Sequence, residues 1–430
     1  MSNTREYAEK LLKYLDASPT PFQSVDELEK MLLAAGACEL IESDEWKLEK
    51  GKLYYMKKAG TQIVAFRVAS EPKETGFRIG AAHHDAPGFR IKTVPSSVDG
   101  GYERIMVEGF GGLIIHSWLD RPLSAAGRVY VKDSESAEGF RAVNVNIKKP
   151  IFLIPSPAPH VKKDINENSK YSIQNEMCPF FAIAKDGKKT FASYLADQIG
   201  VTEGDILSYE LAPYDATPGC FTGANEEFIS VPRLDDCAMA HAIITGMCDS
   251  AESNTTAIAA IFDHEEIGSN SDRGARCNTI MQLVDRICEK LGYTTEDKYR
   301  ALANSMIFSA DMAHATHPAF RGLQDPKLPV QIGAGPVLKL SSGQHYSTSA
   351  RGTAFFRTLC EKENIPYQQF NNNSDTRGGG TIGPILSSAY GVCSVDLGNP
   401  MLAMHSVREF GGADDGYYMA KIFEAFFIGK

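Results

Sequence analysis

A short apolar run, Thr256–Phe262, leads directly into Asp263-His264-Glu265-Glu266 and limits the folds open to this chain. An apolar run of this length between polar residues predicts a strand that is buried on both faces of a parallel sheet. Glu265 and Glu266 then stand where open α/β sheets usually place their ligands. Adjacent acids repel one another, so a bound cation is one way to hold them near a core. The alternative is a solvated turn that begins a helix with acidic residues.

Other segments of the chain also carry side chains that commonly bind metals at the end of an apolar run or at the start of a helix. These side chains are His83, Asp85, Asp235, Asp311 and His405. If the strands are parallel, their carboxyl ends meet at one edge of the sheet and gather these side chains with the acidic pair. Histidines and carboxylates without cysteine suit zinc, cobalt or manganese, and this many acids can hold two ions that share one carboxylate. The sequence therefore predicts a metal-dependent hydrolase.

The individual roles within this set stay open at the level of residue pattern. Alternate residues of an extended segment point the same way, so Asp85 is able to orient His83 from behind the site. One of Glu265 and Glu266 is free to act as the general base that deprotonates a metal-bound water.

The pattern along the chain predicts an α/β fold that is interrupted by a β-rich insertion. Residues 93–229 contain short β-prone runs, among them 113–117 and 127–131, separated by Gly, Pro, Asn and Asp. This texture suits an all-β module, with residues 162–176 as a long mobile excursion. We therefore expect a discontinuous α/β domain over residues 1–92 and 230–430, with an inserted β-rich domain over residues 93–229.

Composition excludes several classes of function. The chain has 44 Lys and Arg against 54 Asp and Glu, and the net charge of −10 argues against binding to nucleic acid or to an anionic membrane. Neither a signal peptide nor an apolar run of about 18 residues is visible. The 9 cysteines are scattered and never form a CxxC pair, which is typical of reduced thiols. We expect a cytoplasmic protein.

Competing catalytic motifs are weak. The loop at residues 378–380 lacks the lysine of a phosphate-binding loop. It is either a tight turn or a loop whose backbone N–H groups line the site. Residues 219–221 show no nucleophile-elbow pattern, which argues against serine hydrolase chemistry. Isolated histidines are more often surface or satisfied core residues than ligands; in this chain they are His84, His116, His241 and His264.

A set of motifs spans nearly the whole chain. They lie at residues 18–22 (Ser-Pro-Thr-Pro-Phe), 82–87 (Ala-His-His-Asp-Ala-Pro), 117–124, 232–236, 263–269, 309–314 and 404–409. In content and order this set resembles the aspartyl aminopeptidase family of di-zinc metallopeptidases. The resemblance implies a zinc-peptidase-like α/β/α catalytic domain with an inserted β-rich dimerisation domain.

The resemblance also implies a role for each presumed ligand. Asp235 would bridge two zinc ions. His83 and Asp311 would complete the coordination of one ion. Glu266 and His405 would complete that of the other.

The same resemblance implies the reaction. Asp85 would orient the His83 side of the site, and Glu265 would be the general base that activates the metal-bridging water. The expected function is removal of an N-terminal residue, preferably Asp or Glu, from short peptides. Two alternatives stay open: a metal-dependent deacylase of N-acyl amino acids, and a non-catalytic assembly protein, although the latter conflicts with the presence of Glu265 and every presumed ligand.

Substrate contacts and partners follow from the same comparison. Lys339 would lie near the pocket for the substrate's first side chain, where a cation favours an acidic residue. His160 would reach the active site of a neighbouring subunit. His314, Gly379 and Gly380 are further candidates for substrate binding. The resemblance implies a homo-oligomer that is built from dimers and assembles into a dodecamer. Three segments depart from the usual family pattern, at Gln23, at residues 344–347 and at residues 374–380, and they leave the acidic preference open.

Overall fold

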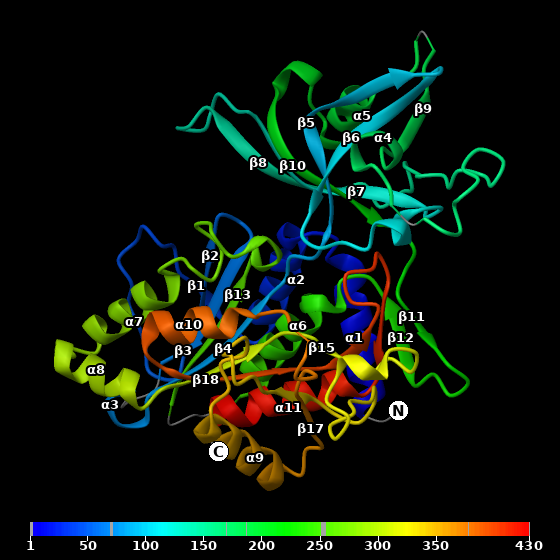
Figure 1. The fold of residues 1–430 in the computed structure, drawn as a ribbon. Coiled ribbons are helices and arrows are strands. Elements are labelled where there is room, and N and C mark those ends of the chain that lie inside the picture. The colour runs from blue at the N-terminus through cyan, green and yellow to red at the C-terminus, as the bar shows by residue number, and fades with distance from the viewer. Residues whose placement is uncertain are drawn as a thin grey trace.

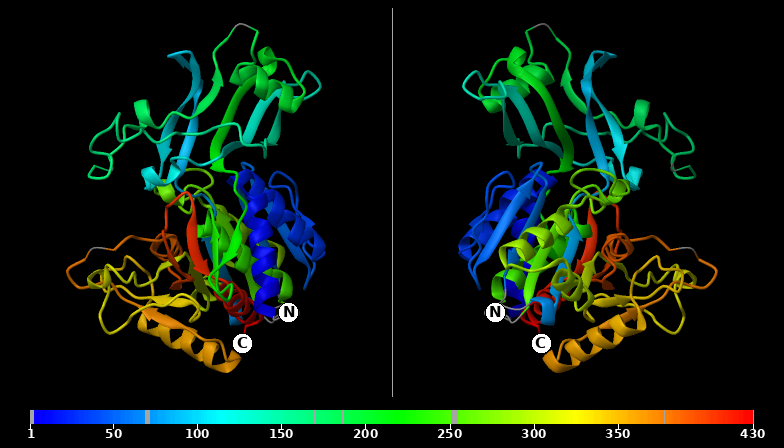
Figure 2. Two further views of the ribbon diagram at one scale, coloured as in Figure 1. Left: turned by 90° about the vertical axis from the view of Figure 1, so that its right-hand side faces the viewer. Right: turned by 90° about the vertical axis from the view of Figure 1, so that its left-hand side faces the viewer.

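The computed structural model of the protein describes residues 3–68, 72–168, 170–185, 187–250, 255–376 and 378–429. The chain forms a lower body built around a large sheet and an upper module that stands on it (Figure 1). Both labelled termini lie in the lower body (Figure 2). The part of the chain that enters the upper module is therefore internal to the sequence of the lower body.

The structure has the following elements. The strands are β1 (Cys38–Glu39), β2 (Leu53–Lys58), β3 (Gln62–Arg67), β4 (Phe77–His83), β5 (Gly88–Asp99), β6 (Tyr102–Phe110), β7 (Leu123–Lys132), β8 (Phe140–Asn146), β9 (Phe180–Ile183), β10 (Ile206–Asp215), β11 (Cys220–Thr222), β12 (Phe228–Val231), β13 (Thr256–Phe262), β14 (Met306–Ala310), β15 (Ala313–His314), β16 (Val337–Lys339), β17 (Gln368–Phe370), β18 (Cys393–Gly398), β19 (Pro400–Leu402) and β20 (Glu409–Gly412). The α-helices are α1 (Asn3–Ala17), α2 (Pro21–Ala34), α3 (Pro72–Thr75), α4 (Ile173–Glu176), α5 (Phe191–Ile199), α6 (Leu234–Asp249), α7 (Thr279–Lys290), α8 (Thr295–Ala303), α9 (Ala350–Glu363), α10 (Ile382–Tyr390) and α11 (Asp415–Ile428). The 3₁₀ helices are η1 (Ile115–Trp118), η2 (Glu203–Asp205), η3 (Glu265–Ile267) and η4 (Arg321–Leu323).

The large sheet of the lower body has the strand order β1-β2-β3-β13-β4-β14-β18-β16-β17. The central strands β13, β4, β14 and β18 run parallel to one another. Alternate residues of β13 pack into different layers: Ala259 and Ile261 join a core that includes α1, α6 and α11, whereas Ala260 and Phe262 join one that includes α7 and α10. Helices therefore cover both faces of the sheet, and the predicted α/β/α arrangement is confirmed.

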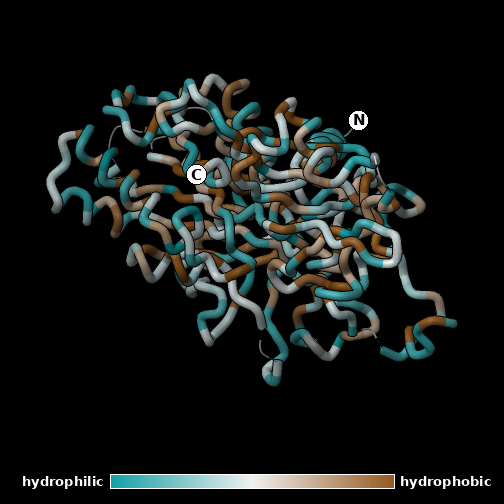
Figure 3. The backbone as a smooth tube through the Cα atoms, turned by 90° about the horizontal axis from the view of Figure 1, so that it is seen from above, coloured by the Kyte–Doolittle hydropathy of each residue, from teal (hydrophilic) through white to brown (hydrophobic). Residues whose placement is uncertain are grey.

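The upper module contains two antiparallel sheets, with strand orders β10-β7-β8 and β5-β6-β9. They share an apolar core with α5, in which Phe89, Val129 and Phe191 are buried. Seen from above, hydrophobic segments run mainly through the middle of the molecule (Figure 3). The prediction of a β-rich insertion is thus confirmed. The exact domain boundaries at 92/93 and 229/230 stay a prediction.

Some local predictions within the insertion were wrong. Residues 113–117 do not form a strand, because Ile115–Trp118 turn into a 3₁₀ helix that presents Trp118 edge-on to Phe89, with ring centroids 5.0 Å apart. The module also contains helix α5, which the all-β interpretation did not include. Thr190 caps α5 by accepting a hydrogen bond from the Ser193 N–H. This capping residue is a local sequence signal for a helix, but the short apolar runs around it favoured an all-β interpretation.

Among the described residues, no helix combines the length and the apolarity that crossing a membrane requires.

Burial of His241 predicts a loss of stability in acid. His241 lies on α6, its Nδ1 is 2.9 Å from the Tyr7 hydroxyl, and burial with a smaller effect of the Lys10 charge lowers its pKa to about 3. Below about pH 6.5 the His241 imidazole binds a proton in the unfolded chain but stays neutral in the folded protein. The free energy of unfolding therefore falls as the pH falls, by at most about 1.4 kcal/mol per pH unit. We expect His241→Gln to reduce the change in urea midpoint between pH 7 and pH 5. The exposed His116→Gln is the control, and equal changes in both variants would contradict the assignment.

Candidate active site

The presumed ligands meet because the central strands are parallel. His83 is the last residue of β4, Asp311 follows β14 directly, and Glu265 and Glu266 lie in η3 just after β13. Strands that run parallel end at the same edge, so these side chains project into one region. His405 reaches the same region from the turn between β19 and β20, and Asp235 reaches it from the first turn of α6.

Asp235 lies at the start of α6 but does not cap this helix. The backbone at Asp235 and Asp236 departs from helical values, and neither side chain caps α6. The irregular turn instead directs the Asp235 carboxylate toward the strand ends. The polar character of the first turn thus serves the site and not the helix.

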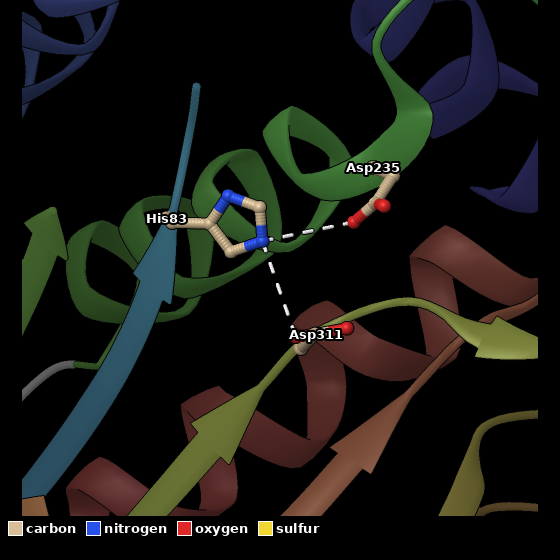
Figure 4. A group of neighbouring side chains, drawn as sticks. All are labelled: His83, Asp235 and Asp311. Carbon is tan, nitrogen blue, oxygen red and sulfur yellow. Dashed lines mark ion pairs between the residues drawn. The ribbon is translucent and has the colours of Figure 1, made fainter. Parts of the chain in front are cut away.

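The side chains form two groups that share Asp235. In the first group, His83 Nε2 lies 3.7 Å from Asp235 Oδ1 and 3.9 Å from Asp311 Oδ2 (Figure 4). In the second group, His405 Nε2 lies 3.3 Å from Asp235 Oδ2 and 3.4 Å from Glu266 Oε1. Two ligand atoms that bind the same zinc ion, each at about 2 Å, lie roughly 3–4 Å apart. Both groups therefore have the spacing of a metal site.

A further grouping leaves the role of Glu265 open on geometry alone. His83, Glu265 and Glu266 also offer ligand atoms within 4.8 Å of one another. Glu265 therefore lies within reach of an ion as well as of the cavity.

Asp85 lies behind this arrangement and is fully buried. Its Oδ1 is 3.3 Å from His83 Nδ1, on the side of the ring opposite the cavity. The same carboxylate accepts hydrogen bonds from the backbone N–H groups of Glu265 and Glu266, both at 3.1 Å. One side chain thus contacts the residues of two neighbouring strand ends.

The chemistry of the site fits a divalent cation. Among the described residues, Asp235 Oδ1 is buried without a hydrogen-bond partner. Burial and neighbouring carboxylates raise the pKa of Glu265 to about 8, against the opposite effect of His83. Burial lowers the pKa of His405, but its contacts with Asp235 and Glu266 outweigh this and raise the pKa to about 11. Burial likewise raises the pKa values of Glu266 and Asp311, and a bound cation would offset this cost of holding carboxylates together.

The two groups open into a cavity of about 430 Å³. Lys339, His314, Gly379 and Gly380 line this cavity together with the presumed ligands. Lys339 is buried, and its Nζ donates to Asp311 Oδ1 at 3.0 Å and to the Met312 carbonyl at 2.7 Å. The substrate-binding candidates on this chain therefore all lie beside the ligands, except one.

That exception is His160, which is exposed in a loop of the upper module and does not line the cavity. Its predicted contact is with a neighbouring subunit, so the position within one chain does not test it. The isolated histidines do not line the cavity either. His84, for example, is buried and satisfied, with Nδ1 2.8 Å from Ser24 Oγ and Nε2 2.5 Å from the Thr61 carbonyl.

Several cavity residues were not found by sequence reasoning. The remaining lining residues give the wall an apolar and aromatic character; they are Met312, Ala313, Tyr346, Phe370 and Met404. Met312 and Met404 are next to the predicted ligands Asp311 and His405 in the sequence, so their place in the cavity wall was predictable. Phe370 ends the edge strand β17, and no local pattern connects it to the site.

Comparisons with known proteins agree with this geometry. A model of the family described as Aminopeptidase I zinc metalloprotease (M18) matches residues 14–427. The chain is 40% identical to "Probable M18 family aminopeptidase 2" of Clostridium novyi (strain NT), over 99% of this chain and 100% of that protein.

Solved structures share the fold. A chain in the cryo-EM structure of the Ape4 and Nbr1 complex superposes with a TM-score of 0.95 at 32% identity, over 99% of this chain and 86% of that chain. A chain in the structure of the S. cerevisiae mApe1 dodecamer superposes with a TM-score of 0.86 at 26% identity, over 99% of this chain and 97% of that chain. The site, the family match and the relatives point the same way: this chain belongs to the M18 family of aminopeptidases, which are zinc metalloproteases.

Proposed function

We propose that this aminopeptidase removes the N-terminal residue, preferably Asp or Glu, from short peptides. The observation that carries the proposal is the cavity itself, in which two ligand groups share Asp235 and Glu265 lies beside them. The cavity of about 430 Å³ has room for an N-terminal residue and the first peptide bond beside these groups.

We assign two zinc ions to each chain, on the basis of the two ligand groups. His83 and Asp311 would hold one ion, and Glu266 and His405 would hold the other. Asp235 would contribute one carboxylate oxygen to each, as its two contacts at 3.7 and 3.3 Å support. Bound zinc polarises the scissile carbonyl and makes a water acidic near neutral pH. Cobalt or manganese also suits these donors.

Within this site we assign the proton transfers to Glu265. Its carboxylate takes a proton from the attacking water and delivers that proton to the leaving amine. Its position beside both ligand groups and at the cavity suits this task, because a base must lie within reach of the attacking water. Asp85 would keep the His83 ring in the required orientation through the contact at Nδ1.

The acidic preference rests on Lys339, the cation in the cavity wall. Its ammonium group is buried near Tyr346, with Nζ 5.5 Å from the ring centroid. An acidic side chain entering the cavity would gain a charge-assisted hydrogen bond in a place of low solvent exposure. Lys339 also pairs with Asp311, so its charge is shared between the site and the substrate.

Replacement of Lys339 by Met should reduce the preference for acidic residues. Loss of a charge-assisted bond of about 1.5–3 kcal/mol predicts that the ratio of kcat/KM for Asp over Ala amides falls about 10- to 100-fold. The ratio is the informative measurement because Lys339 also contacts Asp311. Disturbing that presumed ligand would lower kcat/KM for both amides and leave their ratio unchanged. Lys339→Arg keeps the charge and is the matched control. An unchanged ratio in Lys339→Met would show that Lys339 acts only through Asp311.

The function as a whole is tested by assaying the purified protein, with its bound metal counted, on chromogenic amides of Asp, Glu, Leu and Ala and on their N-acetyl forms. Cleavage of the free-amine Asp and Glu amides is the expected result. Cleavage of Leu or Ala amides instead would keep the reaction and remove the acidic preference. Turnover of the acetylated forms alone would identify a deacylase, and absence of turnover with metal bound would favour a non-catalytic assembly protein.

We propose that the chain forms a homo-oligomer built from dimers, and that a dodecamer is the final state. The support is the likeness to the S. cerevisiae mApe1 dodecamer. In this proposal residues 93–229 mediate dimerisation, residues 1–92 and 230–430 form the catalytic domain, and His160 enters a neighbouring subunit's site. A cytoplasmic location stays a prediction.

A further inference from the structure

Two buried carboxylates outside the ligand set hold the backbone of the ligand-bearing segments. Glu409, on β20, accepts a hydrogen bond from the Asp235 N–H at 3.0 Å through Oε2 and from the His405 N–H at 2.8 Å through Oε1. Asp236 accepts from the His83 N–H at 3.3 Å through Oδ2 and from the Met312 N–H at 3.1 Å through Oδ1. Each carboxylate therefore joins two segments that are distant in the sequence.

Two of these segments, at Asp235 and His405, need such partners because their backbone lies outside regular helices and ladders. Asp235 has non-helical dihedral angles, and His405 has a φ of 68°, in the left-handed region. A backbone N–H that neither helix nor sheet engages costs free energy when it is buried, unless a side chain accepts from it. Glu409 and Asp236 are 2% and 0% exposed, so water does not replace them.

Neither carboxylate is placed to bind an ion or to touch a substrate. Asp236 and Glu409 belong to none of the potential metal groups, and neither lines the cavity of the site. Both oxygens of each carboxylate are already engaged by backbone donors. Their influence on the site must therefore pass through the segments that they hold.

Each of the two carboxylates, Glu409 and Asp236, supports a different ligand group. Glu409 joins Asp235 to His405, which face each other in the second group across 3.3 Å. Asp236 joins His83 to Met312, the neighbour of Asp311, and thus fixes the first group. A ligand spacing that is set in advance removes a cost that metal binding would otherwise carry.

We propose that Glu409 and Asp236 are positioning residues, each of which fixes the ligand spacing of one metal position through backbone hydrogen bonds. This inference rests on the proposed two-zinc site. Glu409 acts on the ion held by Glu266 and His405, and Asp236 acts on the ion held by His83 and Asp311.

The test is zinc affinity in the variants Glu409→Gln and Asp236→Asn. An amide has the same shape but presents an NH₂ group to one of the two backbone donors, so one hydrogen bond is replaced by repulsion. Loss of such a supporting contact typically weakens metal binding about 10- to 100-fold. We expect each variant to lose this affinity at one position, so that dialysis against a chelator leaves one ion where the wild type keeps two.

Asp415→Asn is the matched control. Asp415 is 1% exposed and clamps two backbone N–H groups in the same way, those of Gly333 at 2.8 Å and Gly335 at 2.9 Å, but it holds no ligand segment. We expect this variant to lose thermal stability and to keep the zinc affinity of the wild type. A purely structural role of Glu409 and Asp236 predicts the same behaviour as Asp415→Asn and would overturn the proposal.

Cobalt substitution adds a readout that does not depend on activity. The visible spectrum of bound cobalt reports the geometry of each position, so it should change for one ion in each variant. If an amide variant does not fold, as judged by circular dichroism of the metal-free protein, Glu409→Asp or Asp236→Glu replaces it in the same comparison. A wild type that binds no zinc would refute the proposed function, whereas variants that bind zinc like the wild type would refute only this inference.

Discussion

Glu265→Gln is expected to lower kcat by about 100- to 10,000-fold, the usual contribution of a general base, while the protein keeps its zinc. Glutamine preserves the shape of the side chain but does not accept the proton of the attacking water. Because the loss lies in proton transfer, KM should change little and kcat should carry most of the effect. Single-residue release from an Asp amide, with metal content measured on the same sample, is the assay.

Glu266→Gln is the matched control, because the two residues are adjacent, share η3 and have the same chemistry. Glu266 lies 3.4 Å from His405 Nε2 in the second ligand group, so its replacement should lower zinc content together with activity. Glu265 also lies within a possible ligand group with His83. If Glu265→Gln loses zinc as Glu266→Gln does, Glu265 is a ligand and the base must be sought elsewhere in the cavity.

The sheet and the position of the site were predictable because their signals are local. The apolar run that becomes β13 has no polar residue from Ala257 to Phe262, and the acids follow immediately. Parallel pairing of β13, β4, β14 and β18 then brings the strand ends together without further information. The pairing of strands thus converts scattered residues into one cavity.

The supporting contacts were not predictable, because they join segments that no local pattern relates. Lys339 reaches Asp311 from β16, which runs antiparallel to its neighbour β18, so the strand-end rule does not apply to it. Glu409 and Asp236 were visible only as members of the matching motifs, and their backbone partners follow from the folded turns alone. His405 Nδ1 similarly contacts the Gly112 carbonyl, at 3.0 Å, from the upper module.

Asp235→Asn is expected to have the largest effect on metal content, because Asp235 faces both ligand groups. One carboxylate oxygen lies 3.7 Å from His83 Nε2 and the other 3.3 Å from His405 Nε2. An amide keeps one oxygen donor, and its nitrogen does not bind zinc at this position. We expect the variant to hold at most one ion, and to lose at least about 100-fold in kcat/KM, since a metal contributes several kcal/mol to such a reaction.

The neighbouring Asp236→Asn separates loss of a ligand from loss of its support. Excess zinc should restore activity to Asp236→Asn, in which every presumed ligand remains and only affinity falls. Excess zinc should not restore the activity of Asp235→Asn, because a higher zinc concentration does not supply the missing carboxylate ligand. Rescue of Asp235→Asn by zinc would mean that the two groups do not need a shared carboxylate, and that a single ion is sufficient for hydrolysis.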